Sequence, residues 1–379
     1  MGDSELAAGQ EHEGRMRYAL FLAGGSGTRL WPMSLRREPK QLIPLPGGKD
    51  LLQLAVHRLS AVVDINRRYI CALEEHKARI LQVPGLFHPR CYIGEPMGRD
   101  TLAAVATGMA VISLEDPQAI VGVFTSDHVI EPVTQFRSIV MSGYQFVEEN
   151  PDTLLTFGVA PRRPATEFGY LELGAYCGAI ARRVARFREK PDISTAQQYL
   201  EAGPNRYLWN SGMFIWKAST FLACVKRFEP DVFSGVTEIA QAWQGPDRCA
   251  KLTSTYPRLR RISVDYAIME PASADPAIKI AAIPMPLEWK DVGSWLSFAD
   301  VCDKDAMGNA HTQGKHLLMG CRDSLIVSSD GDHLVAGIGC EGLIIVHTKE
   351  ATLVCPKDRA GDIRDLQERI SKEFGDRYT

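Results

Sequence analysis

A short apolar run that ends in closely spaced glycines constrains this chain more than any other stretch. Residues 18–23, Tyr-Ala-Leu-Phe-Leu-Ala, are brief and continuously apolar, which predicts a buried strand. The glycines that follow are Gly24, Gly25 and Gly27. Glycine adopts backbone angles that other residues avoid, and it lets the main chain approach a ligand closely. Because successive backbone N–H groups in such a turn suit phosphate oxygens, the stretch predicts a phosphate cradle.

Two cations after the glycines narrow the kind of cradle. Arg29 can grip two phosphate oxygens at once, and Lys40 adds a second positive charge. A Walker A loop is excluded because no Lys-Ser or Lys-Thr pair follows these glycines. The Rossmann fingerprint is excluded because Leu30 stands where its third glycine would be. Taken alone, the loop fits a nucleoside triphosphate cradle and a purely structural turn about equally well.

Composition excludes several classes of partner. The chain has 379 residues, more than one average domain, and a net charge of −3, so no global basic field suits nucleic acid or an anionic membrane. No apolar run approaches the roughly 20 residues of a membrane span. Nine cysteines without a C-x-x-C pair argue against a disulfide framework or a zinc site, and free thiols predict a cytoplasmic location. Residues 1–16 are largely polar and predict a flexible tail.

From residue 18 to about residue 156, short apolar runs alternate with longer amphipathic ones, and a more irregular region follows within a predicted domain of residues 17–303. The predicted strands are 18–23, 69–73, 91–93, 119–124, 155–159 and 170–173. The predicted helices are 51–63, 101–114 and 132–149. This alternation predicts an α/β domain with a Rossmann-like, doubly wound mixed sheet, in which ligands gather at the carboxyl ends of the strands.

Residues 304–379 consist of short apolar runs separated by glycines, which predicts a small β-rich C-terminal domain. Its strands are expected at 325–327, 334–336, 343–346 and 353–354, with glycines between them. An amphipathic helix at 362–374 is expected to close the chain. None of these residues forms a convincing catalytic group, so we expect this domain to support the larger one and to make subunit contacts.

One segment closely resembles the signature of the sugar-1-phosphate nucleotidyltransferases. It is Gly25-Ser-Gly-Thr-Arg-Leu-Trp-Pro-Met-Ser, with Pro39-Lys-Gln after it. The Trp-Pro-x-Ser and Pro-Lys-Gln forms are most similar to the bacterial mannose-1-phosphate guanylyltransferases. The resemblance extends over residues 18–369 through several separate motifs. It implies transfer of GMP from GTP to α-D-mannose 1-phosphate with Mg²⁺ as cofactor. It also implies that the C-terminal domain is left-handed β-helix-like.

In the implied reaction, a sugar 1-phosphate attacks the α-phosphorus of GTP in line, and pyrophosphate leaves. Arg29, Lys40 and Lys190 are the expected catalytic cations, because they would offset the repulsion between two polyanions. The expected partners are GTP, the sugar 1-phosphate and a second copy of the chain in a homodimer. Two alternatives stay open: a related transferase for another sugar phosphate or nucleotide, and a non-catalytic regulatory subunit that binds a nucleotide-sugar.

Two aspartates are the candidate metal ligands. Asp127 follows the predicted strand at 119–124, where it would meet a ligand or, as an equal alternative, cap the next turn. The resemblance favours the first role and identifies Asp291, in Glu-Trp-Lys-Asp-Val-Gly-Ser-Trp, as the second ligand. Mg²⁺ usually takes one or two carboxylates from a protein. His128 is expected to be a structural partner, since imidazole suits magnesium poorly.

The resemblance also implies a set of nucleotide contacts, namely Ala23, Gly24, Gly25, Gly27, Thr28, Glu95, Thr101 and Ser126. Asp100 departs from the family, which usually has asparagine at this place. An ionised aspartate would accept hydrogen bonds from N1–H and N2–H of guanine but would repel O6. If Asp100 instead caps the helix that begins at Thr101, the change is nearly neutral.

Further segments resemble the family's sugar-phosphate site. The expected contacts are Gly169, Tyr170, Glu172, Glu189, Asn210 and Ser211, with Lys190 at the phosphate. From the residues alone, Lys190 fits an ordinary solvated charge, and the Asn-Ser-Gly at 210–212 fits a simple turn. For Asp265, a ligand contact and a helix N-cap are equally good interpretations.

Overall fold

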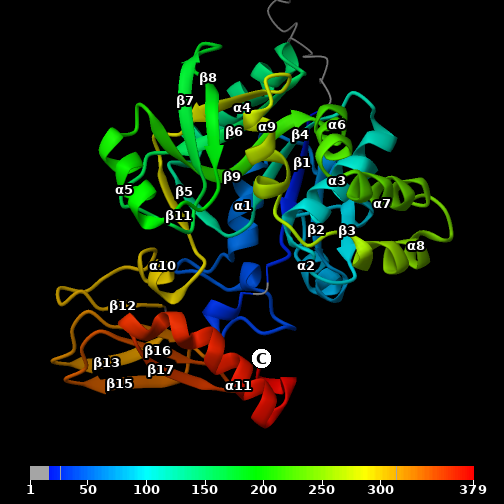
Figure 1. The fold of residues 1–379 in the computed structure, drawn as a ribbon. Coiled ribbons are helices and arrows are strands. Elements are labelled where there is room, and N and C mark those ends of the chain that lie inside the picture. The colour runs from blue at the N-terminus through cyan, green and yellow to red at the C-terminus, as the bar shows by residue number, and fades with distance from the viewer. Residues whose placement is uncertain (1–16, 26, 313) are drawn as a thin grey trace, which may run out of the picture.

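The computed structural model describes residues 17–25, 27–312 and 314–379, so the predicted tail at 1–16 lies outside the described residues. A nine-stranded sheet in the order β3-β2-β1-β4-β9-β6-β10-β8-β7 forms the centre of the larger part of the chain (Figure 1). Its strands are β1 Arg17–Leu22, β2 Arg68–Leu73, β3 Tyr92–Glu95, β4 Ile120–Thr125, β6 Thr153–Val159, β7 Tyr170–Tyr176, β8 Arg182–Arg188, β9 Tyr207–Lys217 and β10 Lys279–Pro284. The six strands predicted in this region are all present, with slightly shifted ends.

The sheet is mixed, as predicted, and its parallel half defines one edge for ligands. Strands β3, β2, β1 and β4 run parallel, whereas β9 runs antiparallel to both β4 and β6. Leu22 at the end of β1 pairs with Cys71 of β2 and Thr125 of β4. The glycine turn and the residues after β4 therefore leave the sheet at the same carboxyl edge, where ligands of such sheets bind.

Helices cover both faces of this sheet. They are α1 Leu51–Leu59, α2 Lys77–Leu81, α3 Asp100–Glu115, α4 Val133–Glu149, α5 Ile193–Ala202, α6 Ala218–Phe228, α7 Pro230–Gln241, α8 Arg248–Thr255 and α9 Glu270–Ala274. Alternate residues of β1 enter two cores: Tyr18 and Leu20 lie in the core that includes α3, and Ala19 and Phe21 in the core that includes α1 and α4. No described helix combines the length and the apolar character needed to cross a membrane.

The C-terminal part of the chain is β-rich, as predicted. Its strands are β12 Ala310–His311, β13 Lys315–Met319, β14 Leu325–Ser328, β15 Leu334–Ile338, β16 Leu343–His347 and β17 Thr352–Pro356. Strands β12, β14 and β16 pair in parallel, and so do β13 and β15, so successive turns of chain stack into a β-helix-like body. The amphipathic helix α11, Ile363–Phe374, follows these strands.

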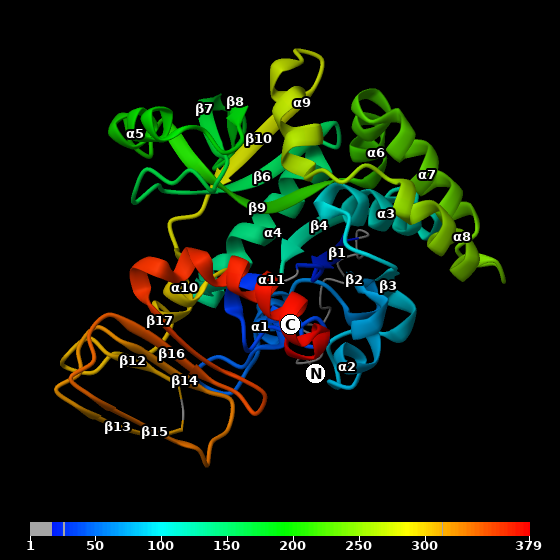
Figure 2. The same cartoon turned by 60° about the horizontal axis from the view of Figure 1, so that its bottom comes forward.

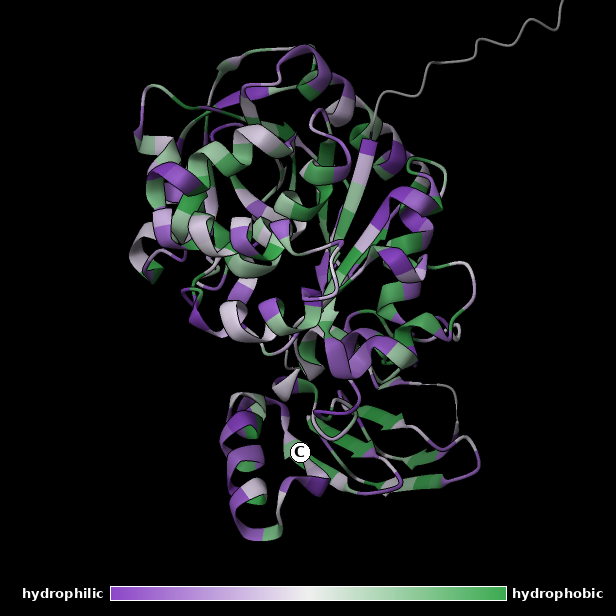
Figure 3. Cartoon of the chain, turned by 90° about the vertical axis from the view of Figure 1, so that its right-hand side faces the viewer, coloured by the Kyte–Doolittle hydropathy of each residue, from purple (hydrophilic) through white to green (hydrophobic). Residues whose placement is uncertain are grey.

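A third core joins this β-rich body to the loop after β1. Leu30, Trp31 and Leu45 from that loop are buried together with Leu325 and Val346 of the C-terminal strands. Figure 3 shows the apolar strands of the smaller body and the alternating polar and apolar residues of its helix. The loop that begins with the glycines is therefore packed against residues from the other end of the chain.

We expect Leu325→Ala to lower the free energy of unfolding by about 2–5 kcal/mol, the usual cost of removing a fully buried leucine side chain. Leu325 is 0% exposed, whereas Val354 on β17 of the same four-stranded sheet is 62% exposed. The control variant Val354→Ala should change stability by no more than about 0.5 kcal/mol. Urea denaturation followed by circular dichroism measures both values, and equal losses would contradict the assignment of this core.

Candidate active site

A backbone ladder brings the two predicted metal ligands together. Asp127 follows β4, and the next strand, β5 His128–Glu131, pairs antiparallel with β11 Glu288–Asp291. Asp291 stands opposite His128 in this pairing, and the Val292 amide donates to the Asp127 carbonyl at 2.9 Å. Ligand atoms of Asp127, His128 and Asp291 all lie within 4.8 Å of one another. Residues far apart in the sequence thus form one group that could hold a divalent metal ion.

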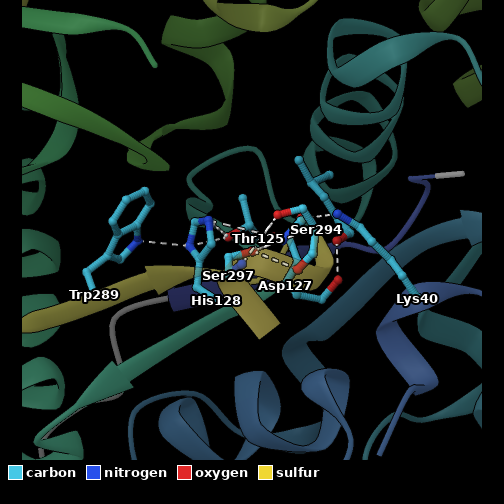
Figure 4. Close-up of polar contacts among 10 residues, drawn as sticks. Lys40, Thr125, Asp127, His128, Trp289, Ser294 and Ser297 are labelled. Carbon is cyan, nitrogen blue, oxygen red and sulfur yellow. Dashed lines mark hydrogen bonds and ion pairs between the residues drawn. The ribbon is translucent and has the colours of Figure 1, made fainter. Parts of the chain in front are cut away.

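Lys40 is the direct partner of this group. Its Nζ lies 2.5 Å from Oδ2 of Asp127, as Figure 4 shows. Burial alone would raise the pKa of Asp127, but Lys40 and His128 hold it well below its usual range. Burial and the neighbouring Asp127 raise the pKa of Asp291 to about 6. The two carboxylates repel each other in a site that a divalent cation would suit, because carboxylate oxygens are the ligands such cations prefer.

His128 makes polar contacts with neighbouring side chains, and its structural role stays a prediction. Its Nδ1 accepts from the Trp289 indole at 3.2 Å and lies 2.7 Å from the Thr125 hydroxyl (Figure 4). Burial lowers the pKa of His128 to about 4, so the ring is neutral at pH 7. Its Nε2 lies 3.7 Å from Oδ1 of Asp127. The ring therefore packs between the Trp289 side chain and the carboxylates.

The glycine loop lies beside the carboxylates. Gly27 has a φ of 62°, and a Cβ at this position would overlap Ser34 and Lys40, so only glycine fits. Arg29 lies in the 3-10 turn Thr28–Leu30 and is exposed. Its Nη2 is 3.1 Å from the position that a Cβ on Gly293 would take. The positive charge of Arg29 opposes the rise in the pKa of Asp291.

A cavity of about 210 Å³ connects Asp127 with the glycine turn and the start of α3. Lys40, Glu95, Thr101 and Asp127 belong to its wall. Glu95 is only 3% exposed, and its Oε1 accepts from the Tyr256 hydroxyl at 2.5 Å. Burial raises the pKa of Glu95 to about 7. Because β2 and β1 lie between β3, which holds Glu95, and β4, which Asp127 follows, the two carboxyl groups stand at separate ends of this wall.

Other members of the predicted nucleotide set hold the edge of the sheet. The Ala23 amide donates to the Cys71 carbonyl at 2.9 Å. The Ser126 hydroxyl donates to the Leu22 carbonyl at 2.5 Å and is 1% exposed. Thr101 Oγ1 accepts from the Val264 amide at 2.9 Å. These contacts position the main chain, and direct contacts between these residues and a nucleotide stay a prediction.

Asp100 is exposed and is the first residue of α3, with a φ of 62°. Its Oδ1 accepts from the Thr101 amide at 2.8 Å, which satisfies one free N–H of the first helical turn. Asp100 also belongs to the wall of the 210 Å³ cavity. The residue that precedes α3 is Arg99, which makes no side-chain cap contact, so Asp100 satisfies this N–H from within the first turn. The buried carboxylate in this cavity is Glu95.

The predicted sugar-phosphate residues form a second polar cluster. Lys190 Nζ lies 3.3 Å from Oε1 of Glu189, and the Asn210 amide donates to Oδ1 of Asp265 at 2.8 Å. Burial, and then the charge of Asp265, raise the pKa of Glu189 to about 7. Gly169 has no room for a Cβ because Glu189 fills that space. The residue that precedes this helical turn is Val264, and Asp265 is the first residue inside it, so the N-cap interpretation of Asp265 is wrong.

The structure does not bring every predicted residue into this cluster. Within the described chain, the contact of the Glu172 carboxylate is with Arg206, at 3.1 Å, rather than with Lys190. Tyr170 is buried, and its hydroxyl has no partner among the described residues. Ser211 is buried and its Oγ accepts from the Met213 amide at 3.3 Å. Ligand contacts of these three residues stay predictions.

Sequence reasoning missed three contributors to the site. Tyr256 reaches Glu95 across 161 residues of sequence, and no motif marks it. Gln41 stands in the Pro-Lys-Gln motif, and its buried Oε1 has no partner among the described residues. Its position next to Lys40 was the signal that could have identified it. The third contributor is α11, which faces the glycine loop across a larger cavity.

Paired carboxylates beside cations from separate elements suit the joining of two phosphate-bearing reactants, so the fold and the site define a nucleotidyltransferase. A family model described as nucleotidyl transferase matches residues 18–307. A second, described as a MannoseP isomerase/GMP-like beta-helix domain, matches residues 314–370.

Relatives match nearly the whole chain. The xanthan biosynthesis protein XanB of Xanthomonas campestris is 37% identical over 358 residues, which are 93% of this chain and 72% of that protein. A mannose-1-phosphate guanylyltransferase of Klebsiella pneumoniae is 32% identical over 371 residues, 96% of this chain and 76% of that protein. A crystal structure described as a mannose-1-phosphate geranyltransferase from Thermus thermophilus has a TM-score of 0.82 at 28% identity, covering 94% of this chain and 99% of that one. The chain belongs to the nucleotidyl transferase family, in the group of the mannose-1-phosphate guanylyltransferases, which confirms the resemblance seen in the motifs.

We expect Asp127→Asn and Asp291→Asn each to lower the turnover rate at least about a hundredfold, as the loss of a charge-stabilising group commonly does. Pyrophosphate release, followed at several magnesium concentrations, measures the effect. Asp303→Asn removes an exposed carboxylate from the segment after β11 and serves as the control. Near wild-type turnover of either active-site variant would remove that residue from the metal site.

Proposed function

We propose that this chain transfers GMP from GTP to α-D-mannose 1-phosphate, giving GDP-mannose and pyrophosphate. The observation that carries the proposal is the close group of Asp127, Asp291 and Lys40 at the carboxyl edge of the sheet. The Lys190 cluster provides a second polar site, as a reaction between two substrates requires. Relatives named mannose-1-phosphate guanylyltransferase support the choice of nucleotide and sugar.

The chain's cations address the main obstacle to this reaction, which is repulsion between two sets of phosphates. Two unit charges about 4 Å apart repel by about 4 kcal/mol at an effective dielectric constant near 20. Arg29 and Lys40 lie beside the glycine loop and would bind the nucleotide phosphates, while Lys190 would bind the sugar phosphate. A phosphate monoester is already ionised at neutral pH, so positioning and electrostatic stabilisation supply the acceleration and no general base is required.

We infer that the metal is Mg²⁺ and that Asp127 and Asp291 hold it. Their oxygens fit a hard cation that usually takes one or two carboxylates from the protein. Lys40 keeps Asp127 ionised, and the raised pKa of Asp291 reflects burial and the crowding of like charges. When bound, Mg²⁺ would neutralise phosphate charge and polarise the α-phosphoryl group.

We infer that Glu95 selects guanine. A carboxylate can accept hydrogen bonds from N1–H and N2–H of guanine, whereas adenine has no hydrogen on N1. Tyr256 holds one carboxyl oxygen of Glu95. The other oxygen, Oε2, lies against Gly24, where a Cβ would stand 2.7 Å away, so glycine keeps this face of the carboxyl group open.

Glu95→Gln should raise the KM for GTP by about tenfold and reduce the preference for GTP over ATP, since a bidentate base contact is worth about 1–3 kcal/mol. The pKa of Glu95 is about 7, so its accepting, ionised form is lost as the pH falls below 7. In the wild type, the KM for GTP should therefore rise as the pH is lowered from about 8 to about 6. The variant should lack this dependence, and identical pH profiles would exclude Glu95 as the base-reading group.

We propose a homodimer that forms through the outward face of β13 and β15. Leu317, Met319, Leu334 and Ile338 are exposed there, and the parallel register, with Met319 opposite Ile338, places them on one face. Such apolar patches commonly mark protein contacts. In size-exclusion chromatography with light scattering, the wild type should be a dimer and a Leu317→Lys, Ile338→Lys variant a monomer. A monomeric wild type would contradict the proposal.

A cytoplasmic location is proposed for the same chain. All nine cysteines are free thiols, which suits a reducing compartment.

The experiment that tests the proposed reaction is a screen of several sugar 1-phosphates against the common nucleoside triphosphates, with pyrophosphate release as the readout. We expect the highest kcat/KM with mannose 1-phosphate and GTP. A higher value with another pair would assign a related transferase activity. Nucleotide-sugar binding without any pyrophosphate release would instead assign the non-catalytic regulatory subunit.

A further inference from the structure

A second cavity at the glycine loop, larger than the one described above, has a wall from the C-terminal helix. This cavity measures about 570 Å³, and Gly25 and Thr28 of the loop face it from one side. Gln367, Ser371 and Lys372 of α11 face it from the other. Figure 2 shows α11 between the β-rich body and the part of the sheet that holds β1 and β2. A cavity of this volume lies in the range of small-molecule sites, about 300–1,000 Å³.

Specific contacts fix α11 against the loop. The Trp31 indole donates to the Tyr378 carbonyl at 2.6 Å, and the Arg36 amide donates to the Thr379 carbonyl at 3.2 Å. Ile363 at the start of α11 lies in the core that contains Trp31. The wall that α11 provides is therefore a packed part of the structure.

The 570 Å³ cavity continues the smaller one that contains the reaction centre. Both cavities have Gly25 and Gly98 in their walls. The smaller cavity, about 210 Å³, already contains Glu95 at one end and Asp127 with Lys40 at the other. It is below the size of about 300 Å³ from which small-molecule sites usually begin. A triphosphate whose α-phosphorus lies near Asp127 would pass its terminal phosphates over Gly25 and Thr28 into the larger cavity.

Lys372 is the cation of this wall whose charge is not compensated. Two acidic side chains in the wall are in ion pairs, Glu75 with Arg36 at 3.8 Å and Glu368 with Arg364 at 3.4 Å. Asp376 keeps its charge and accepts from the Ser371 hydroxyl at 2.6 Å. Lys372 has no ion pair with any residue in the described part of the chain. An exposed ammonium without a carboxylate partner can bind phosphate oxygens as a mobile point charge.

A buried polar atom in the same cavity also points to a polar ligand. His76 is 4% exposed and its Nε2 contacts the Arg36 carbonyl at 2.8 Å. A carbonyl only accepts, so this contact assigns the proton to Nε2. Nδ1 has no partner among the described residues. Buried polar atoms are rarely left without a partner, and Nδ1 in this tautomer can accept a hydrogen bond from a polar ligand or from a water molecule that the ligand holds.

We propose that Lys372 binds the β- and γ-phosphates of the nucleotide, and hence the pyrophosphate that leaves. This inference rests on the proposed function, which locates the α-phosphorus beside Asp127. It extends the supporting role that the sequence suggested for the C-terminal region, because α11 then supplies a residue that touches the substrate.

Kinetics in both directions test the role of Lys372. Lys372→Ala should raise the KM for GTP by about tenfold, the loss expected for one charge-assisted hydrogen bond. In the reverse reaction, the KM for pyrophosphate should rise by a similar factor. The KM values for mannose 1-phosphate and GDP-mannose should not change, because neither molecule carries the terminal phosphates. The matched control is Arg369→Ala, which removes an exposed cation of the same helix that lies outside the cavity wall.

Two outcomes would overturn the inference: an unchanged KM for pyrophosphate, and equal increases in the KM for pyrophosphate and for GDP-mannose. If no sugar 1-phosphate is turned over, the proposed function fails, and calorimetric titration with GTP and with GMP still tests Lys372. Weaker binding of GTP but not of GMP by Lys372→Ala would support the phosphate contact. Equal binding of GTP by the variant and the wild type would exclude it.

Discussion

The antiparallel pairing of β5 with β11 is the contact on which the site depends. It places Asp291 opposite His128, and the Val292 amide closes the ladder on the Asp127 carbonyl. Main-chain hydrogen bonds thus position two carboxylates from distant parts of the chain. A paired backbone holds its residues more rigidly than contacts between long side chains would. Lys40 and Arg29 can then be placed around a fixed pair of negative charges. A site for phosphate transfer needs this rigidity because its catalytic power comes from preorganised charge.

Buried acids with raised pKa values mark the two ends of the site. Burial raises the pKa of Glu95 to about 7 and that of Asp265 to about 6, and burial with a neighbouring acid does the same for Asp291 and Glu189. Such groups are costly without a ligand, and they concentrate where ligands or cations bind. Glu95 and Asp291 lie on the side that we propose for the nucleotide, and Glu189 and Asp265 on the side that we propose for the sugar phosphate. The polypeptide is therefore least satisfied electrostatically where the two substrates would meet.

The sequence predicted the parts of the site that lie in short motifs. The glycine turn, Lys40 and Asp127 follow strands that apolar runs reveal, and Lys190 with Glu189 stands at the end of β8. Such short motifs cannot predict contacts between segments that lie far apart in the sequence. Tyr256 reaches Glu95 from a region without a motif, and the β5–β11 pairing involves two strands too short to stand out. The N-cap interpretation of Asp265 failed because a tertiary contact with Asn210 replaced the local one.

Trp31 shows why the motif loop cannot be regarded as a separate module. Its indole donates to Tyr378, and its carbonyl accepts from the indole of Trp295 at 2.8 Å. One residue thus joins the glycine turn to the segment that follows Asp291 and to the end of the chain. A graft of the motif onto another α/β scaffold would transfer the reactive residues without their geometry. Exchange of domains between relatives would succeed only if the exchanged parts kept the Trp31 and Trp295 indoles together with the carbonyl groups that accept from them.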